Sequence, residues 1–194
     1  MPREKSFDPD LVLERAVELF WRAGYGGTSM IKLLEGMGIS RQSLYDTFGD
    51  KHSLFLAAMD RYRANVRREL ALELEGPDAA LDGMRAGFDW VREVVFEQPE
   101  HRSCFMANCA LELGQRDPEV RARVAEHLRD IEELFFTTLE RAREGGELSD
   151  SRDTRALARF LTSSIHGLGI MARGGASEQA LADALRTSLS LLAA

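Results

Sequence analysis

Apolar side chains recur at intervals of three and four residues along almost the whole of this 194-residue chain. This spacing puts them on one face of an α-helix, whereas a half-buried strand would alternate strictly. We find no alternating run, internal repeat or low-complexity tract. Asp8-Pro9 and Asp117-Pro118 are typical helix starts, and glycines follow several of the apolar stretches. The pattern predicts an all-α fold of about nine helices.

The expected helices fill most of the chain. The first begins at Pro9 and ends near Gly24, where glycine can close a helix. A proline cannot continue a helix, so Gly76-Pro77 should break a long one. We expect two short helices within 28–48, a third short one over about 104–113, and longer ones over about 50–74, 78–97, 118–144, 153–173 and 177–192.

Residues 28–48 form two short helical stretches around a glycine-bracketed turn. Thr28 is expected to cap the first stretch and Ser40 the second, because a hydroxyl there accepts a free backbone N–H of the opening turn. Gly36 and Gly38 permit a sharp reversal, since glycine adopts positive φ without steric cost. The side chains expected to face inward are Ile31, Leu34, Ile39, Leu44 and Phe48.

The second of these stretches leaves a polar face for solvent. The pattern predicts a helix-turn-helix, which places the N-terminal end of its second helix in the DNA major groove. Arginine and glutamine make bidentate contacts with base edges, while serine and tyrosine reach bases or phosphates. The candidate contacts on this face are Arg41, Gln42, Ser43 and Tyr45.

The segment from Phe7 to about Phe55 resembles the TetR/AcrR family of bacterial transcriptional regulators, most closely in SLYDTFGDKHSLF over 43–55. The resemblance implies an N-terminal three-helix helix-turn-helix domain and a C-terminal helical domain that binds a ligand and dimerises. The matching residues are Ala16, Leu19, Phe20, Gly24, Tyr25, Thr28, Ile31, Gly38, Ser43, Leu44, Tyr45, Phe48, Lys51 and Leu54.

The same resemblance implies a homodimeric repressor that a small-molecule effector releases from palindromic operator DNA. It divides the chain into a DNA-binding domain over 1–50, a connecting helix over 51–75 and a ligand-binding and dimerisation domain over 76–194. Thr28, Ser40 and Lys51 join the candidate DNA contacts, with Lys51 placed near a phosphate.

The last two long helices are implied to form a four-helix bundle with a second chain. Small residues in the first of them would allow a close approach. An apolar stripe is equally what a core within one chain needs, so the residues alone leave both readings open. The candidate interface residues are Leu157, Leu161, Ile165, Leu168, Leu181, Leu185 and Leu189.

Cys104, Asn108 and Glu112 follow a Cys-x-x-x-Asn-x-x-x-Glu pattern that resembles a motif of one branch of the family. Capped by Ser103, Cys104 would lie in the first turn of a helix, where the dipole stabilises a thiolate, and would suit a sensor of oxidants or electrophiles. Alternatively, Cys104 and Cys109 are small core residues. The ligand or sensor candidates are Met84, Phe88, Cys104, Phe105, Asn108, Glu112 and Phe135.

Charge is the main observation against DNA binding. The net charge is −7, and residues 1–75 hold 11 basic and 12 acidic side chains while the remainder holds 14 and 20. Affinity for DNA must therefore come from a few placed groups rather than from a bulk positive field. The acidic balance keeps open a helical ligand-binding protein that does not bind DNA.

Other classes of protein fit poorly. The N-terminus lacks a signal-peptide core, no apolar run approaches the roughly 20 residues of a membrane helix, and two cysteines five positions apart suit a reducing cytoplasm. No catalytic motif stands out, so we expect neither an enzyme nor a cofactor. A zinc site drawn from His101, Cys104, Cys109 and His127 matches no known ligand spacing, and we expect no metal.

Overall fold

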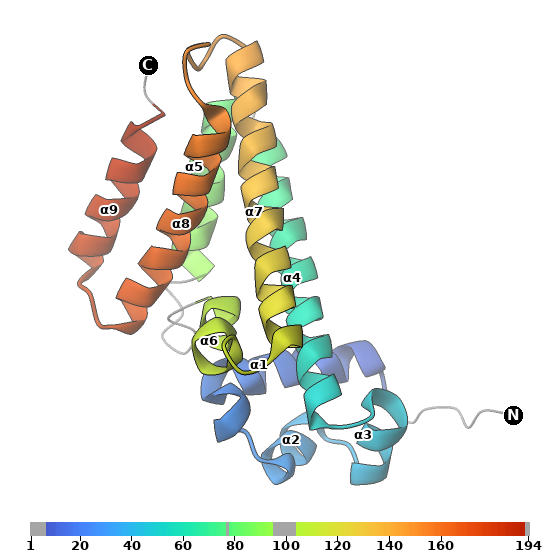
Figure 1. The fold of residues 1–194 in the computed structure, drawn as a ribbon. Coiled ribbons are helices and arrows are strands. Elements are labelled where there is room, and N and C mark those ends of the chain that lie inside the picture. The colour runs from blue at the N-terminus through green and yellow to red at the C-terminus, as the bar shows by residue number, and fades with distance from the viewer. Residues whose placement is uncertain (1–6, 77, 95–103, 193–194) are drawn as a thin grey trace, which may run out of the picture.

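A computed structural model of the chain describes residues 7–76, 78–94 and 104–192. Within these ranges it contains nine α-helices and no strand, which confirms the expected fold class (Figure 1). The helices are α1 Pro9–Gly27, α2 Met30–Met37, α3 Arg41–Phe48, α4 Lys51–Glu75, α5 Ala80–Arg92, α6 Phe105–Leu113, α7 Pro118–Glu144, α8 Thr154–Arg173 and α9 Glu178–Ser190.

The helix starts follow from capping side chains. Asp8 accepts a hydrogen bond from the Asp10 N–H at 2.9 Å, with Pro9 in the first helical position. Asp117 accepts from the N–H groups of Glu119 and Val120 in the same way. Each cap satisfies a backbone donor that the first turn leaves without a helical partner.

Two helix ends need comment. α5 is α-helical to Arg92 and continues as a wider helical turn through residue 94, and its expected end near residue 97 lies outside the described residues. The helical assignment of α1 continues to Gly27, but Gly24 within it has φ 72° and ψ 174°, so the chain kinks where the sequence predicted an end. Only glycine adopts this backbone conformation readily.

Two apolar cores hold the helices together. One joins α1, α2, α3 and the first half of α4 to α6, and the other joins the second half of α4 to α5, α7, α8 and α9. Val66, midway along α4, packs against both cores. Figure 1 shows α4 and α7 rising side by side from the helix-turn-helix, so the two long helices span the molecule.

Ion pairs fix α4 against α7. Arg63 of α4 donates to Asp130 at 2.6 Å and also to Glu126, while Arg123 of α7 donates to Asp60 at 3.1 Å. The Arg63 pairs are partly buried and the Arg123–Asp60 pair is exposed, and all of them join the two helices in addition to their apolar contact. None of the helices in the described ranges is long and apolar enough to cross a membrane.

Candidate DNA-binding surface and effector site

The turn between α2 and α3 reverses at Gly38 as the sequence predicted, whereas Gly36 lies inside α2 and does not take a positive φ. Gly38 is left-handed, with φ 71°, and its N–H donates to the carbonyls of Leu34 and Glu35. Ser40 caps α3 by accepting from the Ser43 N–H at 3.1 Å. Leu44 is fully buried on the inner side of α3. This helix pair is a helix-turn-helix.

Two expectations about α2 are wrong. Ser29, not Thr28, caps the helix by accepting from the Lys32 N–H. The Thr28 side chain is 1% exposed, and its hydroxyl donates to the Gly24 carbonyl at 2.6 Å, so it is not available to DNA. Ile31 is 64% exposed, and Leu33 takes the buried position instead. The serine and threonine are adjacent, and a shift of the cap by one residue rotates the buried face.

The outer face of α3 carries three exposed candidates, Arg41, Gln42 and Tyr45. The Gln42 amide donates to Asp46 Oδ1 at 2.7 Å, which holds it along the outside of the helix. Asp46 is itself exposed and bonds to Gln42. The hydroxyls of Ser40 and Ser43 lie 2.9 Å apart at the start of the helix, where they serve the cap.

Lys51 lies at the junction between helices. Its ammonium donates to the Tyr25 carbonyl at 2.7 Å and lies 4.2 Å from the centre of the Tyr25 ring. Burial lowers the pKa of Lys51, against the raising effect of Glu112. The lysine expected at a phosphate is therefore engaged in holding the end of α1.

Glu112 of α6 ties the C-terminal half of the chain to the DNA-binding unit. Its carboxylate accepts from the backbone N–H of Tyr25 at 2.9 Å and of Gly26 at 2.7 Å. Gly24 has φ 72°, which favours glycine, and a Cβ there would lie 2.6 Å from Glu112 Oε2, so a side chain at this position would displace the carboxylate from the tie. The sequence motif singled out Glu112, but as a ligand candidate and not as this tie.

A second tie joins the starts of α4 and α7. His52 Nε2 and Asp117 Oδ2 lie 2.6 Å apart. The His52 imidazole holds the pKa of the Asp117 carboxyl below its usual value, and the capped N–H groups of Val120 and Glu119 lower it further against burial. α6 and α7 thus each have a direct polar link to the helix-turn-helix side of the molecule.

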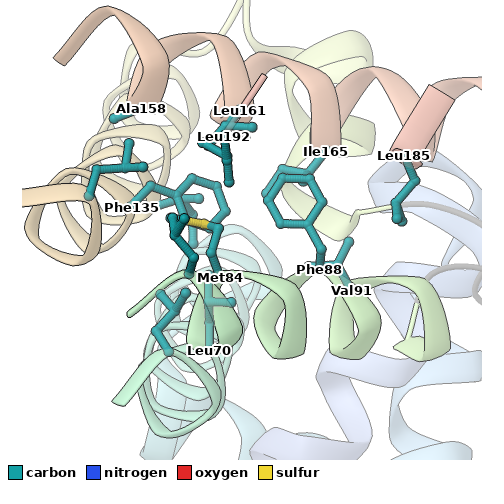
Figure 2. Close-up of a cluster of buried hydrophobic side chains, with 14 of the residues drawn as sticks. Leu70, Met84, Phe88, Val91, Phe135, Ala158, Leu161, Ile165, Leu185 and Leu192 are labelled. Atoms are coloured by element: carbon teal, nitrogen blue, oxygen red, sulfur yellow. The ribbon is translucent and has the colours of Figure 1, made fainter. Parts of the chain in front are cut away.

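The expected ligand residues do not share one cavity, which corrects the prediction. Met84, Phe88 and Phe135 are fully buried in the second core, as Figure 2 shows. Phe105 belongs to the first core. A separate surface groove contains Asn108 and Glu112, beside the end of α1.

A different pocket lies between the two cores. It is a small cavity of about 40 Å³ that opens to solvent, and its walls are mainly apolar. Of the seven sequence candidates, only Cys104 lines it. The lining residues are Tyr62, Val66, Leu70, Trp90, Val91, Val94, Cys104, His127, Ile131, Ile165 and His166.

Cys104 meets polar partners at the edge of this pocket. It is the N-cap residue of α6 and not part of its first turn as expected; Ser103 lies outside the described residues. The Tyr62 hydroxyl is 3.7 Å from its sulfur, and His127 Nε2 is 3.8 Å away. Burial opposes ionisation of the thiol, but hydrogen bonds from His127 and His166 bring its pKa well below the usual value.

The pKa values of two neighbouring groups, His166 and Cys109, are raised, whereas that of Cys104 is lowered. Burial lowers the pKa of His166, but the Cys104 sulfur and the Thr162 carbonyl outweigh it and raise that pKa above normal. Cys109 has no such partners, and burial raises the pKa of its thiol far above the usual range. The two cysteines therefore occupy different chemical environments, although both are buried.

Comparisons with known proteins agree with the geometry. Residues 12–58 match the model of bacterial regulatory proteins of the tetR family, and residues 80–188 match the tetracyclin repressor-like C-terminal domain. The chain belongs to the TetR family. It is a helix-turn-helix transcriptional regulator, similar along its whole length to proteins of that class.

Among the relatives of this TetR-family chain, an uncharacterised HTH-type regulator, YezE of Bacillus subtilis, is 37% identical over 99% of this chain and 100% of its own. The repressor ComR of Escherichia coli is 32% identical over 97% and 90%. A solved structure of the TetR-family regulator CifR, a cysteine mutant with 26-bp operator DNA, has a TM-score of 0.86 and 27% identity, covering 97% of this chain and 98% of that one.

The expected dimer residues of this TetR-family chain require a correction. Five of the seven are under 9% exposed within a single chain, and Figure 2 shows three of them, Leu161, Ile165 and Leu185, in the core around Phe88 and Phe135. Leu157 and Leu189 are half-buried and pack against the same core. The stripe chosen from the sequence is thus the inner face of α8 and α9. The buried five are Leu161, Ile165, Leu168, Leu181 and Leu185.

Proposed function

We propose that this TetR-family chain is a homodimeric repressor that binds palindromic operator DNA and releases it when a small effector enters the C-terminal region. The observation that carries this proposal is the Glu112 tie. It connects α6, whose N-cap residue Cys104 lines the pocket, directly to the backbone that precedes the helix-turn-helix.

The DNA contacts we propose are Arg41, Gln42 and Tyr45, with support from the start of α3. These side chains are exposed on the outer face, where a recognition helix meets base edges. Ser40 and Ser43 contribute the capped N-terminus, which attracts phosphate. Thr28 and Lys51 are left out, because their polar groups are engaged inside the protein.

The dimer contact we propose is the outer face of α8. Phe160, Ile170 and Met171 are 44%, 51% and 40% exposed, and they recur at helical spacing with Gly167 between them. Apart from the neighbouring backbone of α8 itself, a Cβ added to Gly167 would meet no atom of the described residues within 4 Å, so a partner helix can approach closely there. A two-fold dimer is what a helix-turn-helix needs to read two half-sites.

Effector release then follows from the shared helices. α4 starts directly after the recognition helix and ends in the second core, so a change in the pocket moves both α4 and α6. A small shift of these helices alters the separation of the two recognition helices. They then no longer match grooves one turn, roughly 34–36 Å, apart.

The direct test is binding of the purified chain to the DNA upstream of its own gene. We expect a specific complex of two chains per palindrome by fluorescence anisotropy, with weaker binding to shuffled DNA. Equal binding to both DNAs, or none, would instead support the helical ligand-binding protein that the acidic balance left open. As a regulator of transcription, the protein is proposed to act in the cytoplasm, and by binding rather than by catalysis.

One alternative mode of control has its own observation. The Cys104 sulfur lines the pocket, so an electrophile that enters the pocket meets a thiol. We propose electrophile sensing through Cys104 as a second candidate. It predicts that a Cys104 adduct releases operator DNA, whereas a Cys104→Ser variant binds DNA and ignores the electrophile.

A further inference from the structure

Three side chains of the metal-ligand type meet at the pocket from three different helices. Cys104 is at the start of α6, His127 is on α7 and His166 is on α8. Their ligand atoms all lie within 4.8 Å of one another. His127 is 2% exposed and Cys104 9% exposed, so the group is withdrawn from bulk water.

The separations are close to those that a metal ion imposes. Bonds of about 2.3 Å to sulfur and 2.0–2.1 Å to nitrogen, at tetrahedral to trigonal angles, place the two donor atoms about 3.6–3.8 Å apart. The distance from Cys104 Sγ to His127 Nε2 is 3.8 Å. A cysteine and two histidines can therefore close on one ion without moving their helices far.

One outer contact also suits a ligand role. His166 Nδ1 and the Thr162 carbonyl lie 2.7 Å apart, so Nδ1 carries the proton and Nε2 keeps its lone pair. This is the way second contacts usually orient a metal-binding histidine. His127 turns its Nε2 toward the Cys104 sulfur, while its buried Nδ1 has no hydrogen-bond partner among the described residues.

The donor set selects the kind of ion. Thiolate and imidazole favour soft or borderline metals, and a Cys-His-His set is typical of copper and zinc rather than of magnesium or calcium. One thiolate with two neutral imidazoles carries a single negative charge. A monovalent ion makes this set neutral, which lowers the cost of burial, whereas a divalent ion leaves one unit of positive charge.

We propose that Cys104, His127 and His166 form a binding site for a soft metal ion, with copper(I) preferred over zinc(II). On binding, a sulfur–metal bond and nitrogen–metal bonds form, and the one proton that the Cys104 and His166 side chains share leaves to solvent. No electron is transferred when the ion arrives as copper(I). The pocket supplies an approach to the site, as its wall contains all three ligands.

The metal site lies at the start of α6, from which binding of an ion can affect the DNA-binding unit. Cys104 is the residue from which α6 starts, and Glu112 at the other end of α6 holds the Tyr25 and Gly26 N–H groups. Drawing Cys104 toward α7 and α8 pulls on this tie. The regulatory part of the inference rests on the proposed function, in that the metal would be the effector, while metal binding itself does not.

Titration of the full chain with copper(I), in competition with a chromophoric chelator and without oxygen, tests the site. We expect one copper per chain, and an affinity at least about a hundredfold lower in Cys104→Ala, since loss of a mere outer contact costs up to that much. Cys109→Ala is the matched control, being a buried cysteine outside the cluster, and should bind as the wild type does. No copper bound, or equal affinity in Cys104→Ala, would overturn the proposal.

X-ray absorption on the copper-loaded wild type keeps the test independent of how the variants fold. One sulfur and two nitrogen neighbours support the site, and an oxygen-only shell or two sulfurs refutes it. The same titration with zinc(II) tests the choice of ion, because tighter zinc binding would overturn the preference for copper.

Operator binding, measured by fluorescence anisotropy with and without copper, tests the role of the metal as effector separately from metal binding itself. Copper that binds at the site but leaves operator affinity unchanged refutes its role as effector. A chain that binds copper but never binds DNA refutes the proposed function and leaves the metal site standing.

Discussion

At the scale of single residues, Gln42 is the side chain on α3 most suited to reading a base. Its amide is exposed and already held along the helix by Asp46 at 2.7 Å. A pre-oriented amide loses less rotational freedom on binding than a free one. Ser43, in the same turn, shares its hydroxyl with the cap instead.

Replacing Gln42 with alanine should therefore weaken binding to the operator by about 1–3 kcal/mol while sparing non-specific binding, because only a base contact distinguishes sequences. Anisotropy titrations against operator and shuffled DNA at one salt concentration measure both affinities. An equal loss on the two DNAs would show that Gln42 reads no base.

The two cysteines also separate at this scale. Cys104 borders the pocket beside two imidazoles, whereas burial raises the pKa of the Cys109 thiol and Cys109 lies within the first core. Cys104 should react with a small alkylating agent near neutral pH well before Cys109. Mass spectrometry of the native protein resolves the two sites. Labelling of Cys104 only after unfolding would remove it as an electrophile sensor.

At the scale of helices, the cap of α7 has two functions. Asp117 accepts two backbone N–H groups and also binds His52, so it both starts α7 and fixes α7 to α4. Capping of this kind contributes about 0.5–2 kcal/mol. Its effect depends on charge, because the pKa of Asp117 is lowered in the folded protein.

Asp117→Ala should lower the free energy of unfolding by about 1–2 kcal/mol at pH 7. A carboxyl with a lowered folded pKa contributes fully above its unfolded pKa, near 3.9, and loses that contribution as pH falls through the folded value. The difference between wild type and variant should therefore shrink below about pH 4. Urea unfolding at pH 7 and pH 3, at one protein concentration, measures it. A difference that is the same at both pH values would contradict the assigned pKa direction.

What the sequence predicted at this scale was local. The caps at Asp8, Ser40 and Asp117 and the reversal at Gly38 depend on neighbours a few residues away, and the structure confirms them. The site depends on contacts between distant residues. His166 approaches Cys104 only because α8 packs beside α6 and α7, and no spacing in the sequence reports that.

The apolar stripes show a second limit on what the sequence alone can predict. On α8 the sequence offers Leu161 and Leu168 on one side and Phe160 and Ile170 on the other. Helical periodicity shows that both sides are apolar, but it cannot tell which one a chain buries for itself. The leucines are inside, and the more mixed side with Gly167 faces outward.

At the scale of the whole molecule, the outward face of α8 predicts how two chains form a dimer. Ile170→Glu places a charge in the proposed interface but touches little of the chain's own core, as Ile170 is 51% exposed. We expect monomers by light scattering, a retained helical spectrum and loss of operator binding. Leu72→Glu is the matched control, since Leu72 is 61% exposed on α4. A dimeric Ile170→Glu would place the interface elsewhere.

The central claim concerns how the two halves of the molecule communicate. Glu112, 86 and 87 residues away in sequence from its partners, holds the end of α1 through two N–H groups, and Gly24 leaves room for it. If this tie sets the position of the helix-turn-helix, its loss must change DNA affinity although Glu112 lies outside α3. A coupling of 1–3 kcal/mol between sites corresponds to roughly 5–150-fold in affinity.

The most direct measurement is operator affinity of Glu112→Ala by anisotropy, beside Glu119→Ala as a matched loss of an exposed glutamate at the start of α7. We predict that Glu112→Ala remains a folded dimer and binds the operator about tenfold or more weakly, while Glu119→Ala binds as the wild type does. An unchanged operator affinity in Glu112→Ala would contradict the claim that α6 controls the DNA-binding unit.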